Sequence, residues 1–111
     1  MQFKELMNRA LQVRKAYEKF EKNYYGRSWT KENLAQGFVG DVGDLMKLVM
    51  AKEGIRKIEN VDAKLAHELS DCLWSVLVLS HMYEIDLEKS FLGTMGELEE
   101  HLKIQKFLLK K

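Results

Sequence analysis

The sequence predicts an all-α protein, a four-helix bundle-like chain, on three observations. The 111 residues include no proline, the residue that most strongly interrupts a helix. Apolar and charged residues recur with the three-to-four-residue period of helices rather than the alternation of strands. Four such periodic stretches are separated by short breaks that carry helix-capping residues. A chain of this length forms one core, so residues 1–111 are expected to be a single domain.

The first two helices are separated by an aromatic loop. The first is expected over about residues 2–23, and the loop spans residues 24–29. Thr30 can cap the second helix, which runs to about Glu53, where Gly54 can adopt the left-handed conformation of a C-terminal cap. The broad apolar face of the first helix comprises Phe3, Leu6, Met7, Ala10, Leu11, Val13, Tyr17 and Phe20.

The third helix begins near Asn60 or Asp62, both good N-cap residue types, and reaches about Tyr83. Residues 72–79 are apolar on nearly every side. Such a segment must be covered on every side, which predicts contact with a second subunit. Asp86 can cap a fourth helix that runs close to the C-terminus. The predicted core stripe of the third helix is Leu65, Leu69, Cys72, Val76, Leu79 and Tyr83.

Two acidic pairs stand out within the second and third helices. Asp41 and Asp44 are three residues apart, as are Glu68 and Asp71, so each pair projects from one helix face. In an antiparallel helix pair with its turn near residue 57, all four carboxylates lie at one level. Carboxylates on an apolar wall require cations, and hard divalent metals prefer oxygen ligands. The pattern predicts a metal site for phosphate chemistry; the alternative is two solvated acidic flanks.

Composition and charge exclude several other classes. The net charge of +1 lacks the basic character of duplex-binding proteins. The single cysteine, Cys72, and the absence of a signal-like or membrane-length apolar run favour a cytoplasmic protein. Nucleophilic Ser or Cys arrangements and a glycine-rich phosphate loop are absent from the sequence. Gly37, Gly40 and Gly43 recur within the second helix, where their expected use is close approach of another helix.

These residues resemble the MazG-like, all-α nucleotide pyrophosphohydrolase superfamily, which includes dCTP pyrophosphatases and dimeric dUTPases. The family motif is Glu-x-x-Glu followed by Glu-x-x-Asp. Its second half is present as Glu68-Leu69-Ser70-Asp71, and its first half reads Asp41-Val42-Gly43-Asp44. The resemblance spans roughly residues 25 to 96, from the tryptophan before the second helix to the turn into the last one.

The resemblance implies hydrolysis of a nucleoside triphosphate to the monophosphate and pyrophosphate. Asp41, Asp44, Glu68 and Asp71 would bind Mg²⁺, or Mn²⁺, with Glu68 and Asp71 as the catalytic residues. Trp29 would stack on the base, although its alternative role is that of a core or interface tryptophan. The apolar segment of residues 72–79 further predicts an oligomer assembled through helix packing, a homodimer or homotetramer.

The sequence departs from the family pattern at two places. Asp replaces Glu in the first pair, which shortens each ligand by one methylene. Thr94 stands where the family's last helix carries a lysine, and acids follow it where the family has a basic cluster. Three functions therefore stay open: a metal-dependent pyrophosphohydrolase, a regulator that binds metal or nucleotide without turnover, and a structural dimerisation module.

Overall fold

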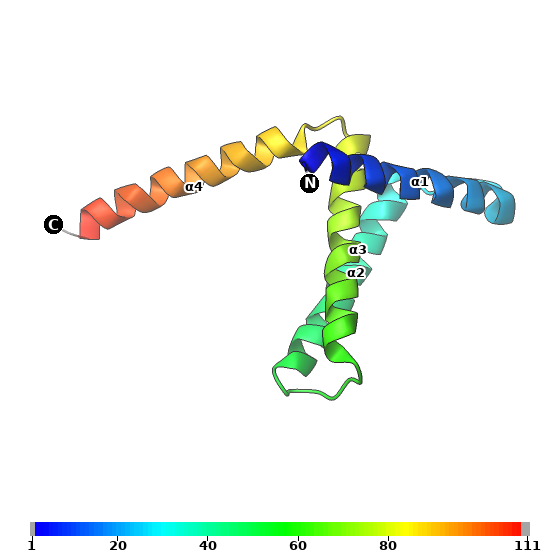
Figure 1. Cartoon of the computed structure of the whole chain (residues 1–111), viewed down its shortest axis with the longest axis horizontal. Helices are drawn as coiled ribbons and strands as arrows, with labels where there is room; N and C mark the ends of the chain where they lie inside the picture. The colour runs from blue at the N-terminus through cyan, green and yellow to red at the C-terminus, as the bar shows by residue number, and fades with distance from the viewer. Residues whose placement is uncertain (1, 110–111) are drawn as a thin grey trace.

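A computed structural model describes residues 2–109 of the chain and shows four α-helices and no strand among them (Figure 1). The all-α prediction with four helices is confirmed. The helices are α1 (Phe3–Tyr25), α2 (Lys31–Lys52), α3 (Val61–Met82) and α4 (Leu87–Leu109).

Local chemistry explains where α1 ends and α2 begins and ends. Gly26 follows α1 with a φ of 75°, and its N–H donates to the carbonyl of Lys22. Thr30 and Asn33 form a capping box at the start of α2: each side chain accepts the backbone N–H of the other residue. Gly54 has a φ of 81° beyond the end of α2, as the sequence predicts.

The starts of α3 and α4 use two different devices. Asn60 occupies the predicted N-cap position of α3, but its side chain makes no capping hydrogen bond. Its φ of 54° lies in the left-handed region, which Asn tolerates better than most residues. Asp86 does cap α4, because its Oδ1 accepts the N–H of Lys89 at 3.1 Å.

The helices pack to very different extents. α2 and α3 lie antiparallel, and α1 crosses the end of this pair where α2 begins and α3 ends (Figure 1). The core cluster at the crossing consists of Ala10, Leu34, Leu77 and Val78. The indole N–H of Trp74 donates to the carbonyl of Ala10 at 3.1 Å, so a hydrogen bond connects α3 with α1. The core cluster thus stabilises the end of the helix pair where α1 crosses it, and the middle of the pair lies outside this cluster.

The buried face of α3 differs from the predicted stripe. Leu69 and Tyr83, which the stripe includes, are 52% and 55% exposed. The buried side is the flank that continues from Glu68 through Ser75 and Val78. Because α3 is apolar on more than one side, apolar periodicity alone does not select the side that α1 and α2 cover. The same placement turns the acidic residues of α3 toward α2.

The predicted role of the α2 glycines is wrong within the described chain. A Cβ added at Gly40 or Gly43 would meet nothing within 4 Å, so neither residue allows a close helix approach. A Cβ at Gly37 would lie 3.6 Å from the indole ring of Trp29. Gly37 therefore faces an aromatic side chain from the loop before α2.

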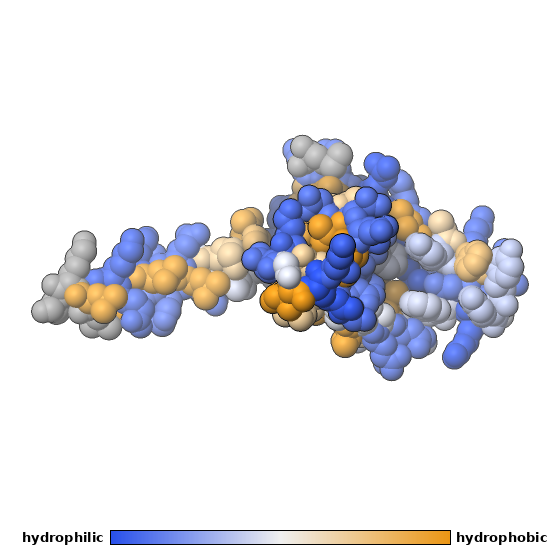
Figure 2. Space-filling model, turned by 90° about the horizontal axis from the view of Figure 1, so that it is seen from below, coloured by the Kyte–Doolittle hydropathy of each residue, from blue (hydrophilic) through white to orange (hydrophobic). Residues whose placement is uncertain are grey.

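α4 extends away from the other three helices (Figure 1). The radius of gyration is 18.3 Å, against about 13 Å for a compact domain of roughly 100 residues. Figure 2 shows hydrophobic side chains along the projecting arm. The exposed large ones on α4 are Phe91, Leu92, Leu98, Leu102, Ile104 and Leu109. No helix in residues 2–109 has an apolar stretch that would cross a membrane.

Candidate functional site

Three of the four predicted carboxylates converge between α2 and α3. Asp41 and Asp44 on α2 and Glu68 on α3 each offer an oxygen, and these oxygens lie within 4.8 Å of one another. Asp41 and Glu68 are partly buried, whereas Asp44 is exposed. The antiparallel pairing of the helices brings these three residues within about one level, in agreement with the convergence predicted from their distances to the connecting turn. We call these three residues the acidic trio.

The acidic trio concentrates negative charge around an unpaired buried oxygen. Oε1 of Glu68 is buried and has no hydrogen-bond partner. Burial raises the pKa of Glu68, and the negative charges of Asp41, Asp71 and Asp44 raise it further. Burial and the same negative surroundings raise the pKa of the Cys72 thiol. A cation bound among the carboxylates would satisfy the buried oxygen and offset this repulsion.

Asp71 lies beside the acidic trio but is not a member of it. Its Oδ2 is 3.2 Å from Nε2 of His67, one turn earlier on α3. The His67 side chain is 75% exposed. The structure therefore brings three predicted ligands together and leaves the fourth paired with a histidine.

Asp41 and Asp71 line an open cavity of about 610 Å³ with aromatic walls. Trp29, the predicted stacking residue, lies in this wall. Four further aromatic side chains complete the wall, and their role was not predicted from the sequence: Tyr17, Phe20, Tyr25 and Trp74. Tyr17 and Phe20 belong to the predicted apolar face of α1, but both are about half exposed. The sequence feature that could have distinguished these two residues from core residues is the cluster of aromatic residues in the second half of α1. We call this space the aromatic cavity.

Asp44 and Glu68 line a second open cavity, of about 520 Å³, on the side toward the α2–α3 connection. Lys47 and Lys64 also line it, and Nζ of Lys47 is 4.0 Å from Oδ1 of Asp44. We call this space the lysine cavity. His67 lines both cavities, and the acidic trio is divided between them: Asp41 lines the aromatic cavity, and Asp44 and Glu68 line the lysine cavity. Neither lysine was predicted as a site residue from the sequence, although Lys47 follows Asp44 by three residues.

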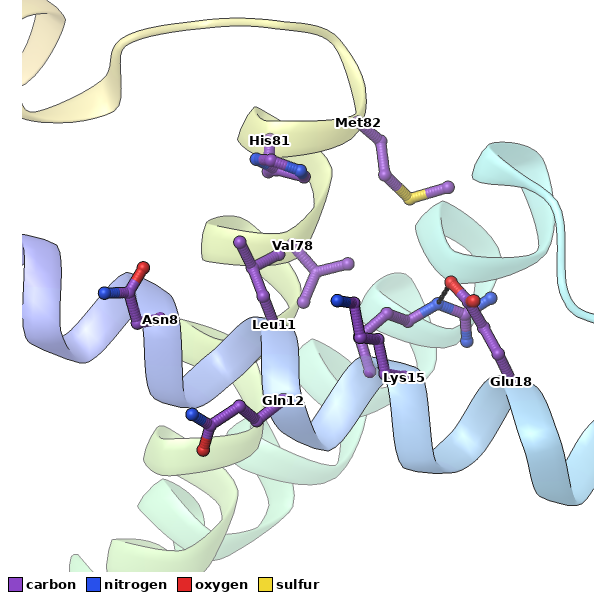
Figure 3. A pocket seen from close by; sticks show the side chains of 9 residues that line it. Asn8, Leu11, Gln12, Lys15, Glu18, Val78, His81 and Met82 are labelled. Atoms are coloured by element: carbon purple, nitrogen blue, oxygen red, sulfur yellow. Dashed lines mark ion pairs between the residues drawn. The ribbon is translucent and has the colours of Figure 1, made fainter.

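A third cavity, of about 500 Å³, lies on the other flank of α1 (Figure 3). It is bounded by α1 side chains such as Gln12 and by His81 and Met82 near the end of α3. These α3 residues follow Glu68 by more than ten positions, which is at least about 15 Å along a helix. This cavity contains no member of the acidic trio.

α4 contributes nothing described to either cavity beside the acidic trio. Thr94 is exposed, as are Glu97, Glu99 and Glu100. The family resemblance predicts a basic cluster on this helix, but acids take its place. No other part of α4 among the described residues lines these two cavities.

Comparisons with known proteins address this combination of fold and site. No curated protein and no solved structure matches the chain significantly. The family model of the MazG nucleotide pyrophosphohydrolase domain matches residues 30–102, well over half of the chain. The match contains α2, α3 and both acidic pairs but begins after α1. The chain belongs to the MazG nucleotide pyrophosphohydrolase family.

Proposed function

We propose that the protein hydrolyses a nucleoside triphosphate to the nucleoside monophosphate and pyrophosphate, as a single domain of residues 1–111 in the cytoplasm. One observation carries the proposal: the acidic trio lies between the aromatic cavity and the lysine cavity. A nucleotide has the same order of parts, with a planar base at one end and a chain of phosphates at the other.

The residues of the acidic trio fit a hard divalent cation. All three offer carboxylate oxygens, the ligand type that Mg²⁺ prefers, and Oε1 of Glu68 is buried without a partner. We propose that Asp41, Asp44 and Glu68 hold Mg²⁺, or Mn²⁺, with Asp71 as the adjacent fourth carboxylate. When bound, the metal supplies positive charge toward the phosphates and lowers the pKa of coordinated water.

Glu68 and Asp71 are the proposed catalytic residues. Glu68 is the one member of the trio from α3 and provides its buried oxygen. Asp71 is outside the trio, so its carboxylate is available to orient an attacking water and accept its proton. His67, at 3.2 Å, holds the Asp71 side chain on the same face of α3. We propose that this pairing fixes the orientation of the base that activates the water.

The aromatic cavity is the proposed site of the nucleotide base. Its volume of about 610 Å³ lies in the range of about 300–1,000 Å³ typical of small-molecule sites. Aromatic rings stack on any base at about 1–3 kcal/mol each. Trp29 is the proposed stacking residue, since its ring borders the cavity that contains Asp41.

Lys47 and Lys64 are proposed to meet the phosphates in place of the missing basic residues of α4. Both line the cavity that contains Asp44 and Glu68. Replacement of both by Met is expected to raise KM by about tenfold and to weaken the dependence of KM on salt, because fewer charges attract the substrate. Lys15→Met is the control, since Lys15 lines the remote third cavity. An unchanged salt dependence would contradict the role of the two lysines.

The protein is further proposed to assemble as a homodimer or homotetramer. Among its described side chains, α4 exposes six large hydrophobic ones, and α3 exposes Leu69 and Leu73, each by 52%. A second copy covers such surfaces in symmetric oligomers. A bundle of four packed helices would then form between chains rather than within one.

A regulator that binds nucleotide without turnover is the second candidate, favoured by the acids of α4. Pyrophosphate release from ordinary and modified nucleoside triphosphates, with Mg²⁺ and with Mn²⁺, separates the functions. The enzyme releases pyrophosphate with at least one substrate, and only when metal is present. The regulator shows metal-dependent nucleotide binding and no release. Absence of both would leave the structural module and refute the proposal.

A further inference from the structure

We propose that a buried ion pair in α1, Arg14 with Glu21, positions Trp29 in the wall of the aromatic cavity. α1 and Trp29 lie outside the residues that the family model matches. The inference rests on the proposed function, because it assigns Trp29 to the nucleotide base. It adds positioning residues from a helix to which neither the motif nor the family match gives a role.

The ion pair holds both backbone groups of Trp29. Arg14 and Glu21 are each 5% exposed, and Nη1 of Arg14 is 3.2 Å from Oε2 of Glu21. Oε1 of Glu21 accepts the backbone N–H of Trp29 at 2.7 Å. Nη2 of Arg14 donates to the carbonyl of the same residue at 2.9 Å. The pair therefore determines where the backbone of this loop residue lies relative to α1.

The position of the Trp29 backbone determines where its indole ring lies. The ring lies against Gly37 on α2, where it is 3.6 Å from the position of an added Cβ. Four residues beyond Gly37, on the same side of α2, is Asp41 of the acidic trio. Trp74, the other tryptophan of the cavity, is also bonded to α1 through the carbonyl of Ala10. Both indoles of the cavity wall are thus located by α1.

Stability alone does not account for this arrangement. Replacing a buried ion pair by apolar residues of similar volume is often neutral or stabilising. The side chain that the pair locates is 47% exposed, so it contributes little as a core residue. The directional bonds to both backbone groups of one residue instead suit a requirement for a fixed ring orientation, which stacking on a planar base has.

The test compares the parent protein with Arg14→Met/Glu21→Leu, which removes both buried charges together, so that no buried charge is left unpaired. Glu18→Gln is the matched control: Glu18 also pairs with Arg14, at 3.4 Å, on the outer flank of α1 (Figure 3). The double variant is expected to raise KM for the triphosphate by about tenfold, because part of one stacking interaction is lost. Its kcat is expected to change less than about threefold. Glu18→Gln is expected to leave both constants unchanged.

Fluorine NMR of protein labelled with 5-fluorotryptophan reports on the ring itself. The Trp29 resonance, assigned with Trp29→Phe, is expected to move in the double variant, and that of Trp74 to keep its position. If the double variant does not fold, Glu21→Gln replaces it, because the amide still accepts the Trp29 N–H but weakens the bond from Arg14. Its KM is then expected to rise severalfold.

If the parent is active and the variants keep its KM, the positioning role is wrong, whether or not the Trp29 resonance moves. A parent without turnover contradicts the proposed function instead. In that event, binding of an α,β-imido deoxynucleoside triphosphate, followed through the Trp29 resonance, decides the inference. Weaker binding by the variant supports the positioning role, and equal binding, or none in the parent, overturns it.

Discussion

The α2–α3 pair and α4 are built from helices of similar length but are stabilised differently. α2 and α3 face each other, bury residues such as Leu48 and Val78, and place the acidic trio between them. α4 has no buried residue among its described side chains. Since most helix stability in proteins comes from packing, α4 is expected to obtain its stability from another copy of the chain. The acidic trio thus forms within one chain, whereas the proposed assembly would stabilise α4.

The largest expected effect concerns the α2–α3 pair. Glu68→Gln keeps the size of the side chain and removes its charge, so turnover is expected to fall by at least about a hundredfold, the scale for a principal electrostatic group. The variant is expected to stay folded because repulsion within the trio decreases. Steady-state pyrophosphate release measures the effect, with Glu53→Gln, an exposed residue at the end of α2, as the control. An unaffected rate in Glu68→Gln would place the chemistry elsewhere.

The next effect concerns α4. Leu98→Glu introduces a charge into its apolar surface and is expected to raise the subunit dissociation constant by about thirtyfold or more, or about 2 kcal/mol, as at an interface hot spot. Light scattering across a concentration series measures it. Lys89→Glu, about half a turn away around the helix, should leave assembly intact. A parent that is monomeric at micromolar concentration would show that α4 has no partner copy.

Metal binding gives a smaller effect that depends on the α2–α3 pair alone. Mg²⁺ or Mn²⁺ at ten times its dissociation constant is expected to stabilise the fold by about 1.4 kcal/mol, seen as a higher melting temperature. Asp41→Asn should remove most of this response, whereas Leu98→Glu should retain it. A parent without any metal-dependent shift would remove the proposed metal site.

The pH dependence of the metal-free protein tests the charge on Glu68. Its pKa is raised in the folded state, so the folded state binds the proton more tightly than the unfolded chain does. This contribution to stability is fully present below the unfolded pKa of about 4.3 and is lost as pH rises through the raised folded pKa. The melting temperature of the parent relative to Glu68→Gln should therefore fall across that window in the presence of a chelator. A constant difference would show that Glu68 titrates normally.

The smallest effect concerns the exposed face of α2. Gly40→Ala is expected to stabilise the protein by about 0.5–1 kcal/mol, because Ala suits a helix interior better than Gly and its Cβ would meet nothing. Gly37→Ala, next to Trp29, should gain less because the ring is already within contact distance. Chemical denaturation measures both. Destabilisation by Gly40→Ala would show that this face lies in an interface between copies.

Much of the fold and part of the site could be predicted from local features. The absence of proline, the helical period and the capping residues Thr30 and Asp86 defined the helices to within about two residues. The spacing of Asp41, Asp44 and Glu68 from one connecting turn predicted their convergence. Asp71 satisfies the same spacing argument, yet its carboxylate pairs with His67, because side-chain rotamers respond to neighbours that spacing does not describe.

The sequence by itself determined the helices, their order and the level at which the acids meet, since each depends on residues that are close along the chain. Only the tertiary structure decided which side of α3 is buried, because several of its sides are apolar and contact with α1 and α2 selects one. It also decided that Tyr17 and Phe20 line a cavity and that Arg14 and Glu21 hold Trp29. The cavity depends on how α1 crosses the helix pair, which is determined by packing between residues distant in sequence. The contacts with Trp29 depend on how the loop after α1 folds back along this helix.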